Sequence, residues 1–110
     1  MKDNYTTEEK INHAKEAILK YVSAKYIYLF GSCAYGEPNV NSDIDICAVI
    51  PDEIESDIFL HGNILEDLSE KQIYEIDLVI KPESKFNYRK TRHRFEETIF
   101  KKGKLVYENP

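Results

Sequence analysis

The hydrophobic positions near the start of the chain recur at the spacing of an α-helix, three or four residues apart. A short polar run of the capping-box type precedes them, in which threonine and glutamate side chains satisfy free backbone N–H groups. That run is Thr6-Thr7-Glu8-Glu9, and the apolar positions are Ile11, Ala14, Ile18, Tyr21 and Val22. We therefore predict one amphipathic helix over residues 7 to 22.

Three segments further along are short, apolar and rich in β-branched and aromatic residues, a composition typical of buried strands. A glycine or a proline soon follows each of them and interrupts the regular backbone. The predicted strands cover residues 26 to 30, 43 to 50 and 73 to 80, and the interrupting residues are Gly31, Pro51 and Pro82.

Further helices and a final strand complete the pattern. Apolar residues at helical spacing predict a helix near residues 53 to 70, which Gly62-Asn63 could interrupt. A basic helix is predicted over residues 87 to 101, ended by Gly103, with a short strand over residues 105 to 107. This order of elements predicts an α/β (α+β) fold, in which a small mixed β-sheet is flanked by helices.

The length and composition of the chain favour one small domain. With 110 residues, 42% of them hydrophobic, we expect a single core and a single domain over residues 1 to 110. Cys33 and Cys47 form no CxxC pair and are expected to be free thiols in a reducing compartment. The charged N-terminus and the lack of a long apolar run predict a soluble, cytoplasmic protein without a membrane segment.

Charge is distributed unevenly along the chain. Residues 1 to 80 hold 6 Lys and Arg against 16 Asp and Glu, whereas residues 81 to 104 hold 9 against 3. The later segment could bind a polyanion or an acidic partner surface, although a solvated helix face explains the same charges. The overall charge of -5 argues against tight binding to a nucleic-acid backbone.

Acidic side chains interrupt two of the predicted apolar strands. Because strand side chains alternate, Asp43 and Asp45 point to the same side as Cys47, and Asp77 lies within the third strand. Buried carboxylates are costly unless they are paired or bind a cation, and two on one face repel each other. Mg²⁺ prefers oxygen ligands from one or two carboxylates together with phosphates and water. The pattern therefore predicts a Mg²⁺ (or Mn²⁺) site.

A phosphate-type loop is predicted directly after the first strand. Gly31 permits a tight turn at which the backbone can approach a ligand closely. Ser32 adds a hydroxyl group and an N–H group that can donate hydrogen bonds to an anion. A loop of this kind beside metal-binding carboxylates would hold a phosphate group.

In their order, these segments resemble the minimal nucleotidyltransferases (MNT) of the DNA polymerase β superfamily. Residues 31 to 36 (Gly-Ser-Cys-Ala-Tyr-Gly) meet the GSxxxG pattern, Ser42-Asp43-Ile44-Asp45 meets the [ST]DxD pattern, and Asp77 supplies the third carboxylate. Each motif alone is common, so the specificity lies in their combination. The resemblance covers about residues 7 to 107 and implies a polymerase β-like nucleotidyltransferase fold.

The resemblance also implies which residues act in the reaction. The catalytic and metal-binding residues would be Asp43, Asp45 and Asp77. The nucleotide-binding residues would be Gly31, Ser32, Gly36 and Ser42, although Ser42 is equally explained as a turn residue. The reaction would be in-line attack of a hydroxyl on the α-phosphate of an NTP, with release of pyrophosphate, and Asp77 would help to activate the hydroxyl.

One part of the pattern departs from many family members, which carry an arginine within the GSxxxG loop. This loop instead holds Cys33, Ala34 and Tyr35. Triphosphate affinity would then be lower, or positive charge would come from elsewhere. Candidates for that charge are Arg89, Arg92 and Arg94, each of which could equally be a solvated side chain.

The resemblance implies an enzyme that moves a nucleoside monophosphate, AMP from ATP by default, onto a hydroxyl. Small family members resemble the antitoxins of two-gene toxin–antitoxin systems, which modify a helical HEPN-domain toxin. Two alternatives are a non-catalytic antitoxin or adaptor and an antibiotic-modifying nucleotidyltransferase. The motifs specify neither the acceptor nor the preferred NTP, and self-association of the chain is also left open.

Overall fold

The computed structural model of the chain describes residues 5–31, 43–54 and 58–109. Its first element is α1, Thr7–Tyr21, and the start of this helix confirms the predicted capping box. The Glu9 N–H donates to the Thr6 hydroxyl at 3.1 Å, and the Thr6 N–H donates to the Glu9 carboxylate at 2.8 Å. These bonds satisfy two backbone groups that the start of a helix leaves free.

In the described parts of the chain, four strands form one mixed sheet, as the sequence predicts. They are β1, Tyr26–Phe30, β2, Ile44–Ile50, β3, Ile76–Pro82, and β4, Lys104–Glu108. β1 pairs antiparallel with both β2 and β4, whereas β2 pairs parallel with β3. The order across the sheet is therefore β3-β2-β1-β4.

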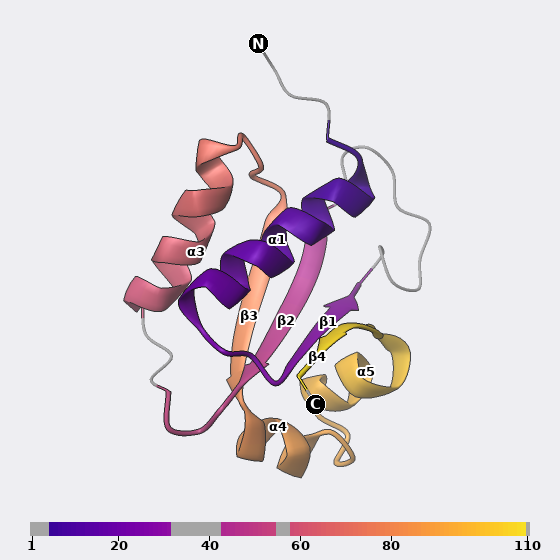
Figure 1. Cartoon of the computed structure of the whole chain (residues 1–110). Coiled ribbons are helices and arrows are strands. Elements are labelled where there is room, and N and C mark those ends of the chain that lie inside the picture. Colours follow the sequence, from indigo (N-terminus) through magenta and orange to yellow (C-terminus); the bar gives the residue numbers. More distant parts are fainter. Residues whose placement is uncertain (1–4, 32–42, 55–57, 110) are drawn as a thin grey trace.

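The parallel pair of strands is joined by a helix. Parallel neighbours need a longer connection than the short turn that joins antiparallel strands. This connection contains α3, Ile58–Glu70, which packs beside α1 (Figure 1). The helix begins later than predicted, because the Ile54 N–H donates to the Pro51 carbonyl at 3.1 Å in a turn. Gly62 lies inside a continuous helix, so the predicted interruption is wrong.

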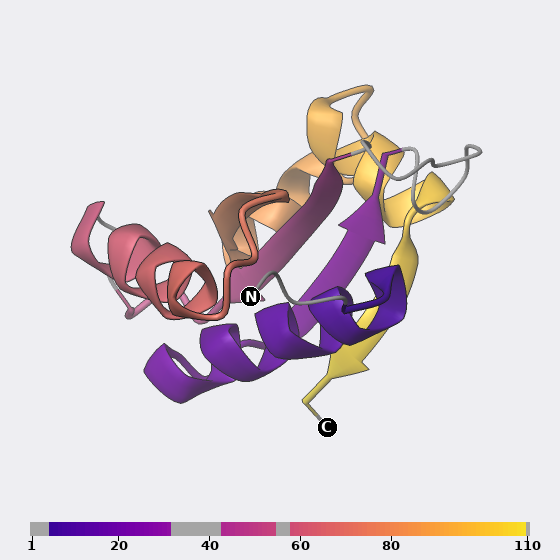
Figure 2. The ribbon, with the colours of Figure 1, turned by 90° about the horizontal axis from the view of Figure 1, so that it is seen from above.

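Helices cover both faces of the sheet, so that the molecule has three layers (Figure 2). One face is covered by α1 and α3, and the other by α4, Glu83–Arg89, and α5, Phe95–Lys102. Side chains of β2 alternate between these layers as predicted. Ile44, Ile46 and Ala48 pack toward α1 and α3, whereas Cys47 and Val49 pack with Phe86 and Ile99 of the other helices.

The single basic helix predicted over residues 87 to 101 is wrong, because the structure has two helices in this region. Residues 90 to 94 separate α4 from α5, and His93 lies there at a φ of 54°. The buried side chains of Phe86 and Ile99 explain the break. In one straight helix, at about 100° per residue, they would point about 140° apart. The break lets both contact the sheet.

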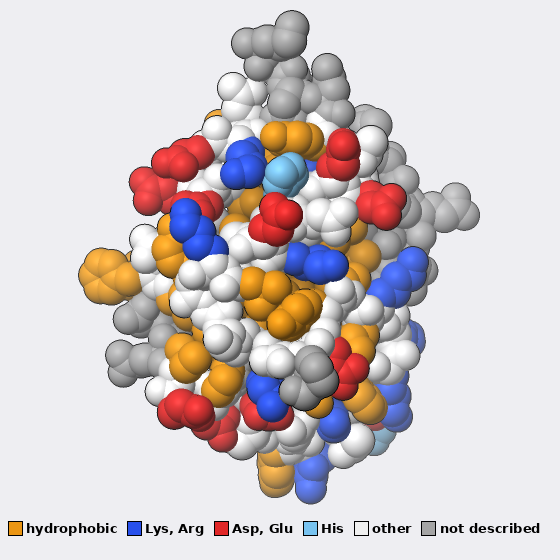
Figure 3. All heavy atoms as spheres, viewed as in Figure 1, with side chains coloured by type: hydrophobic (Ala, Val, Ile, Leu, Met, Phe, Trp, Pro, Cys, Tyr) orange, Lys and Arg blue, Asp and Glu red, His pale blue; other side chains and the backbone are white. Residues whose placement is uncertain are grey.

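The outer surface of α1 and α3 carries charges of both signs. Figure 3 shows acidic and basic side chains interspersed over this face, with apolar side chains between them. The basic segment of residues 81 to 104 contains α4 and α5, which lie on the opposite side of the sheet. Within the described part of the chain, no helix combines the length and the apolar character needed to cross a lipid bilayer.

Candidate functional site

Asp45 and Asp77 are neighbours on adjacent parallel strands. The register of β2 and β3 places these two residues directly opposite each other. Asp43 lies directly before β2, two residues before Asp45, and the alternation of strand side chains predicts that it points to the same face. The tertiary structure thus brings together two predicted carboxylates that are separated in the chain by the whole of α3.

The electrostatic environment of the pair favours a cation. Burial raises the pKa of Asp45, and the charge of Asp77, a hydrogen bond with Asp77 and the charge of Asp43 raise this pKa further. Each of these causes disfavours the ionised carboxylate. A divalent cation between the two side chains would oppose them, because it stabilises the ionised forms of the oxygen ligands that it binds.

The three carboxylates differ in exposure, which the alternation of side chains along a strand does not predict. Asp43 and Asp77 are exposed, and Asp45 is half-buried. Among the described residues, no three His, Cys, Asp or Glu side chains converge closely enough to form a complete metal site. Mg²⁺ needs only one or two protein carboxylates when phosphates and water supply its other ligands. The Asp45 and Asp77 pair would fit this ion, and the metal-binding roles of Asp43, Asp45 and Asp77 stay predictions.

Gly31 lies against the carboxylate of Asp45. It follows β1 directly and has a φ of 74°, a left-handed conformation that glycine adopts without strain. A Cβ atom at this position would stand 2.0 Å from Oδ2 of Asp45. The predicted glycine turn is therefore present, and its backbone approaches the carboxylate more closely than any other residue type permits.

The rest of the predicted phosphate loop lies outside the described residues. This holds for the predicted nucleotide-binding residues Ser32, Gly36 and Ser42, and for Cys33, Ala34 and Tyr35. Their roles in phosphate binding stay predictions. The described part of the site thus consists of the carboxylates and Gly31, at the ends of β1, β2 and β3 that lie close together.

Two of the three arginines considered as phosphate ligands have partners within the chain. Arg89 Nη1 lies 3.9 Å from a carboxylate oxygen of Glu96. Arg92 donates a hydrogen bond to the Tyr88 carbonyl, and its guanidinium carbon lies 4.0 Å from the centre of the Tyr88 ring. Arg94 is exposed at the N-cap position of α5. These local contacts explain much of the basic segment without a bound anion.

A buried carboxylate on α5 was not identified from the sequence. Glu96 is only 1% exposed, and its Oε2 lies 3.5 Å from Nζ of Lys81 on β3 and 3.9 Å from Arg89 on α4. Among the described residues, this buried Oε2 has no hydrogen-bond partner, so the two ion pairs alone oppose its charge. Its position three residues before the buried Ile99, on one helix face, is the only sequence signal of this burial.

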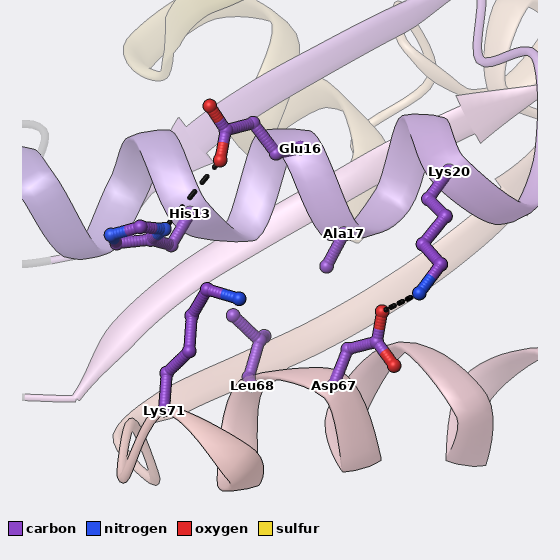
Figure 4. Close-up of a pocket in the computed structure, with 7 residues that line it drawn as sticks. All are labelled: His13, Glu16, Ala17, Lys20, Asp67, Leu68 and Lys71. Atoms are coloured by element: carbon purple, nitrogen blue, oxygen red, sulfur yellow. Dashed lines mark hydrogen bonds and ion pairs between the residues drawn. The ribbon is translucent and has the colours of Figure 1, made fainter.

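A concave region lies between α1 and α3, on the other face of the sheet. It has a volume of about 130 Å³, and Lys20 of α1 pairs with Asp67 of α3 across it at 2.9 Å (Figure 4). His13 and Glu16 approach each other at 3.5 Å along its rim. The carboxylate pair lies across the sheet from this groove, so the groove is not part of the candidate site.

Solved structures with the same fold include toxin–antitoxin proteins. A toxin–antitoxin structure with AMP-PNP is 21% identical, with a TM-score of 0.63 over 94% of this chain and 75% of that chain. A mutant MntA-HpeT toxin–antitoxin complex is 18% identical, with a TM-score of 0.60 over 89% of this chain and 72% of that chain.

An archaeal structure has the same fold over nearly its whole length. This protein, from Sulfolobus solfataricus and provisionally assigned as a nucleotidyltransferase, is 22% identical, with a TM-score of 0.56 over 99% of this chain and 93% of that chain. A search of curated protein sequences finds no significant match. The family profile described as "Polymerase beta, Nucleotidyltransferase" matches residues 12–110. The chain therefore belongs to the polymerase β-like nucleotidyltransferase family.

Proposed function

We propose that this chain transfers AMP from ATP to a hydroxyl group of a helical partner protein, as the antitoxin of a HEPN/MNT toxin–antitoxin pair. The observation that carries the proposal is the opposed pair of Asp45 and Asp77, next to Asp43 and the tight turn at Gly31. Carboxylates held close together at the ends of neighbouring strands suit chemistry on a phosphate that arrives with a cation.

The three carboxylates would have different roles, according to their exposure. Asp45, half-buried against Gly31, would hold Mg²⁺ or Mn²⁺ with Asp43 and Asp77. When bound, the ion would neutralise charge on the phosphates. The exposed Asp77 would take the proton of the attacking hydroxyl. The hydroxyl oxygen then forms a bond to the α-phosphorus, the bond to pyrophosphate breaks, and the protein supplies position and charge.

Two observations support a protein as the acceptor. The solved structures of similar fold include toxin–antitoxin complexes, and one of them contains AMP-PNP. In this chain, residues 81 to 104 hold nine basic side chains against three acidic ones, and two of the nine, Lys81 and Arg89, pair with the buried Glu96. A basic surface of this kind would complement an acidic partner and orient its hydroxyl toward the carboxylates.

The test is transfer of label. The chain is incubated with ATP radiolabelled at the α-phosphate, Mg²⁺ and the helical protein encoded beside it, in parallel with the double variant Asp43→Ala/Asp45→Ala. We expect label on the partner with the wild type and its loss, by at least a hundredfold, with the double variant. Glu16→Ala is the matched control, because it removes an exposed carboxylate on the other side of the sheet.

Other outcomes would redirect the assignment. Equal neutralisation of the partner by wild type and double variant, without label, would mean that the chain acts by occupancy alone. Label found only on small hydroxylated molecules would indicate an antibiotic-modifying transferase. Replacing ATP by the other NTPs in the same assay measures the preferred nucleotide.

A further inference from the structure

An aromatic side chain stands exposed beside the candidate site. Phe95 is the first residue of α5, and 48% of it is exposed to solvent. Its ring meets the ring of Phe30 edge-on, with 5.4 Å between centroids and an angle of 82°. One side of the Phe95 ring thus packs against Phe30, and the exposed part of the ring is open to a ligand.

The sheet register places this ring near the carboxylates. Phe30 is directly opposite Asp45 in the antiparallel pair of β1 and β2, and it immediately precedes Gly31. Opposite side chains in such a pair stand about 5 Å apart at Cβ. The ring of Phe95 contacts the ring of Phe30 on this same face of the sheet. Phe95 therefore lies on the order of 10 Å from the Asp45 carboxylate. A nucleotide bridges such a distance between its phosphates and its base.

The first turn of α5 is held firmly in place, and this fixes the position of the ring. The next residue, Glu96, is buried and forms ion pairs with Lys81 of β3 at 3.5 Å and with Arg89 of α4 at 3.9 Å. Nζ of Lys81 also lies 6.0 Å from the centre of the Phe95 ring. Two ion pairs from different elements thus attach the start of the helix to the site face of the sheet.

We propose that Phe95 is the stacking surface for the base of the nucleotide whose phosphates bind at Asp45 and Asp77. This inference rests on the proposed function and adds to it the subsite for the base. Every nucleobase offers a π-face to an aromatic side chain, so stacking on Phe95 contributes affinity without selecting one base. ATP and GTP should therefore gain from this contact alike.

Other exposed aromatic side chains of the α4 and α5 region offer a comparison. Phe100, on the same helix, is 40% exposed, and Nζ of Lys90 lies 4.5 Å from its ring centre. Tyr88 is 63% exposed, with the Arg92 guanidinium 4.0 Å away. A close cation thus accompanies both rings, whereas the cation nearest Phe95 stands farther off. Phe100 is therefore a matched control of the same residue type and similar exposure.

The experiment measures binding of ATP and of inorganic tripolyphosphate, each with Mg²⁺, by calorimetry. Phe95→Leu keeps an apolar contact with Phe30 but removes the aromatic ring. We expect it to weaken ATP and GTP binding about tenfold or more and to leave tripolyphosphate binding within twofold of wild type. Phe95→Trp should restore ATP affinity, and Phe100→Leu should leave it unchanged. Thermal unfolding of each variant reports whether the fold persists.

The outcomes separate this inference from the function on which it rests. Wild-type chain that binds neither ATP nor tripolyphosphate with Mg²⁺ contradicts both. ATP binding that is equal in wild type and Phe95→Leu overturns the stacking role and leaves the proposed function intact. An equal loss of ATP and tripolyphosphate binding in Phe95→Leu would also overturn the stacking role, because it would indicate that Phe95 maintains the structure of the site. Loss of partner binding alone would identify Phe95 as part of a protein interface.

Discussion

Gly31 combines a backbone requirement with a spatial one. Its φ of 74° is strained for residues that carry a Cβ, and its Cβ position is occupied by the Asp45 carboxylate. We expect Gly31→Ala to lower the free energy of unfolding by about 1 to 2 kcal/mol. The variant should also weaken Mg²⁺-dependent ATP binding, because Oδ2 of Asp45 must move away. Urea denaturation and calorimetry measure the two effects.

Gly62→Ala is the control for this prediction. Gly62 lies within α3, is exposed, and a Cβ there would meet no atom within 4 Å. Alanine has the higher helix propensity, so the substitution should stabilise the protein by about 0.5 to 1 kcal/mol. The glycine requirement at Gly31 would be refuted by a Gly31→Ala variant as stable as Gly62→Ala.

Cys47 is fully buried between the sheet and the helices α4 and α5. Burial raises the pKa of its thiol to about 12, so the reactive thiolate is scarce at neutral or mildly alkaline pH. In a Cys33→Ser variant, we expect no reaction with a thiol reagent at pH 8 in the native state and one reactive thiol in guanidinium chloride. Fast native labelling would mean that this core opens readily.

At the scale of elements, the buried Glu96 joins three pieces of secondary structure. Its ion pairs reach β3 and α4 from the first turn of α5. We expect Glu96→Ala to lower the free energy of unfolding by about 3 kcal/mol, because Lys81 and Arg89 lose their counter-charge and a buried volume is left empty. This value is at the low end for broken buried pairs, since both cations keep partial contact with water.

Glu97→Ala provides the comparison within the same helix turn. Glu97 pairs with Lys101 one turn later at 2.8 Å and with His93 at 3.3 Å, and both of these partners are exposed to salt and water. Its denaturation midpoint should stay close to that of the wild type. Similar midpoints for Glu96→Ala and Glu97→Ala would show that the buried ion pairs do not hold α5 in place.

At the scale of the whole molecule, the strand order makes ligand binding and folding stability dependent on each other. Asp45 and Asp77 come together only in the folded sheet, so a ligand that bridges them binds the native state alone. Mg²⁺ and ATP at a hundredfold above the dissociation constant should add about 2.7 kcal/mol to the free energy of unfolding. Thermal unfolding with and without both ligands measures this increment.

The variant Asp45→Asn should separate the effect of the Asp45 charge on the ligand-free fold from its effect on ligand binding. The pKa of Asp45 is raised in the folded state, first by burial and then by Asp77, so its ionisation at neutral pH destabilises the fold without metal. That penalty is absent below the unfolded pKa and is complete above the folded pKa. At pH 7, Asp45→Asn should therefore melt higher than the wild type without ligands and gain little from Mg²⁺ and ATP. A lower melting temperature without ligands would contradict this reasoning.

Local pattern alone determined most of the elements and predicted the carboxylates of the candidate site. The capping residues Thr6 and Glu9, the aromatic strand before Gly31 and the alternation along β2 act over a few residues, so they are visible in the sequence. The same holds for the motif order that identified the family. A short-range pattern also placed Asp43 and Asp45 on one face, because the side chains of a strand alternate wherever the strand lies.

Only the tertiary structure decided which distant residues meet. The parallel pairing of β2 and β3 sets Asp77 opposite Asp45, and no local spacing specifies that register. The break between α4 and α5 arises because Phe86 and Ile99 must both reach the sheet, a condition that overrides helix propensity at residues 90 to 94. Burial of Glu96 likewise depends on cations supplied by two other elements, and a carboxylate is buried only where such charges converge.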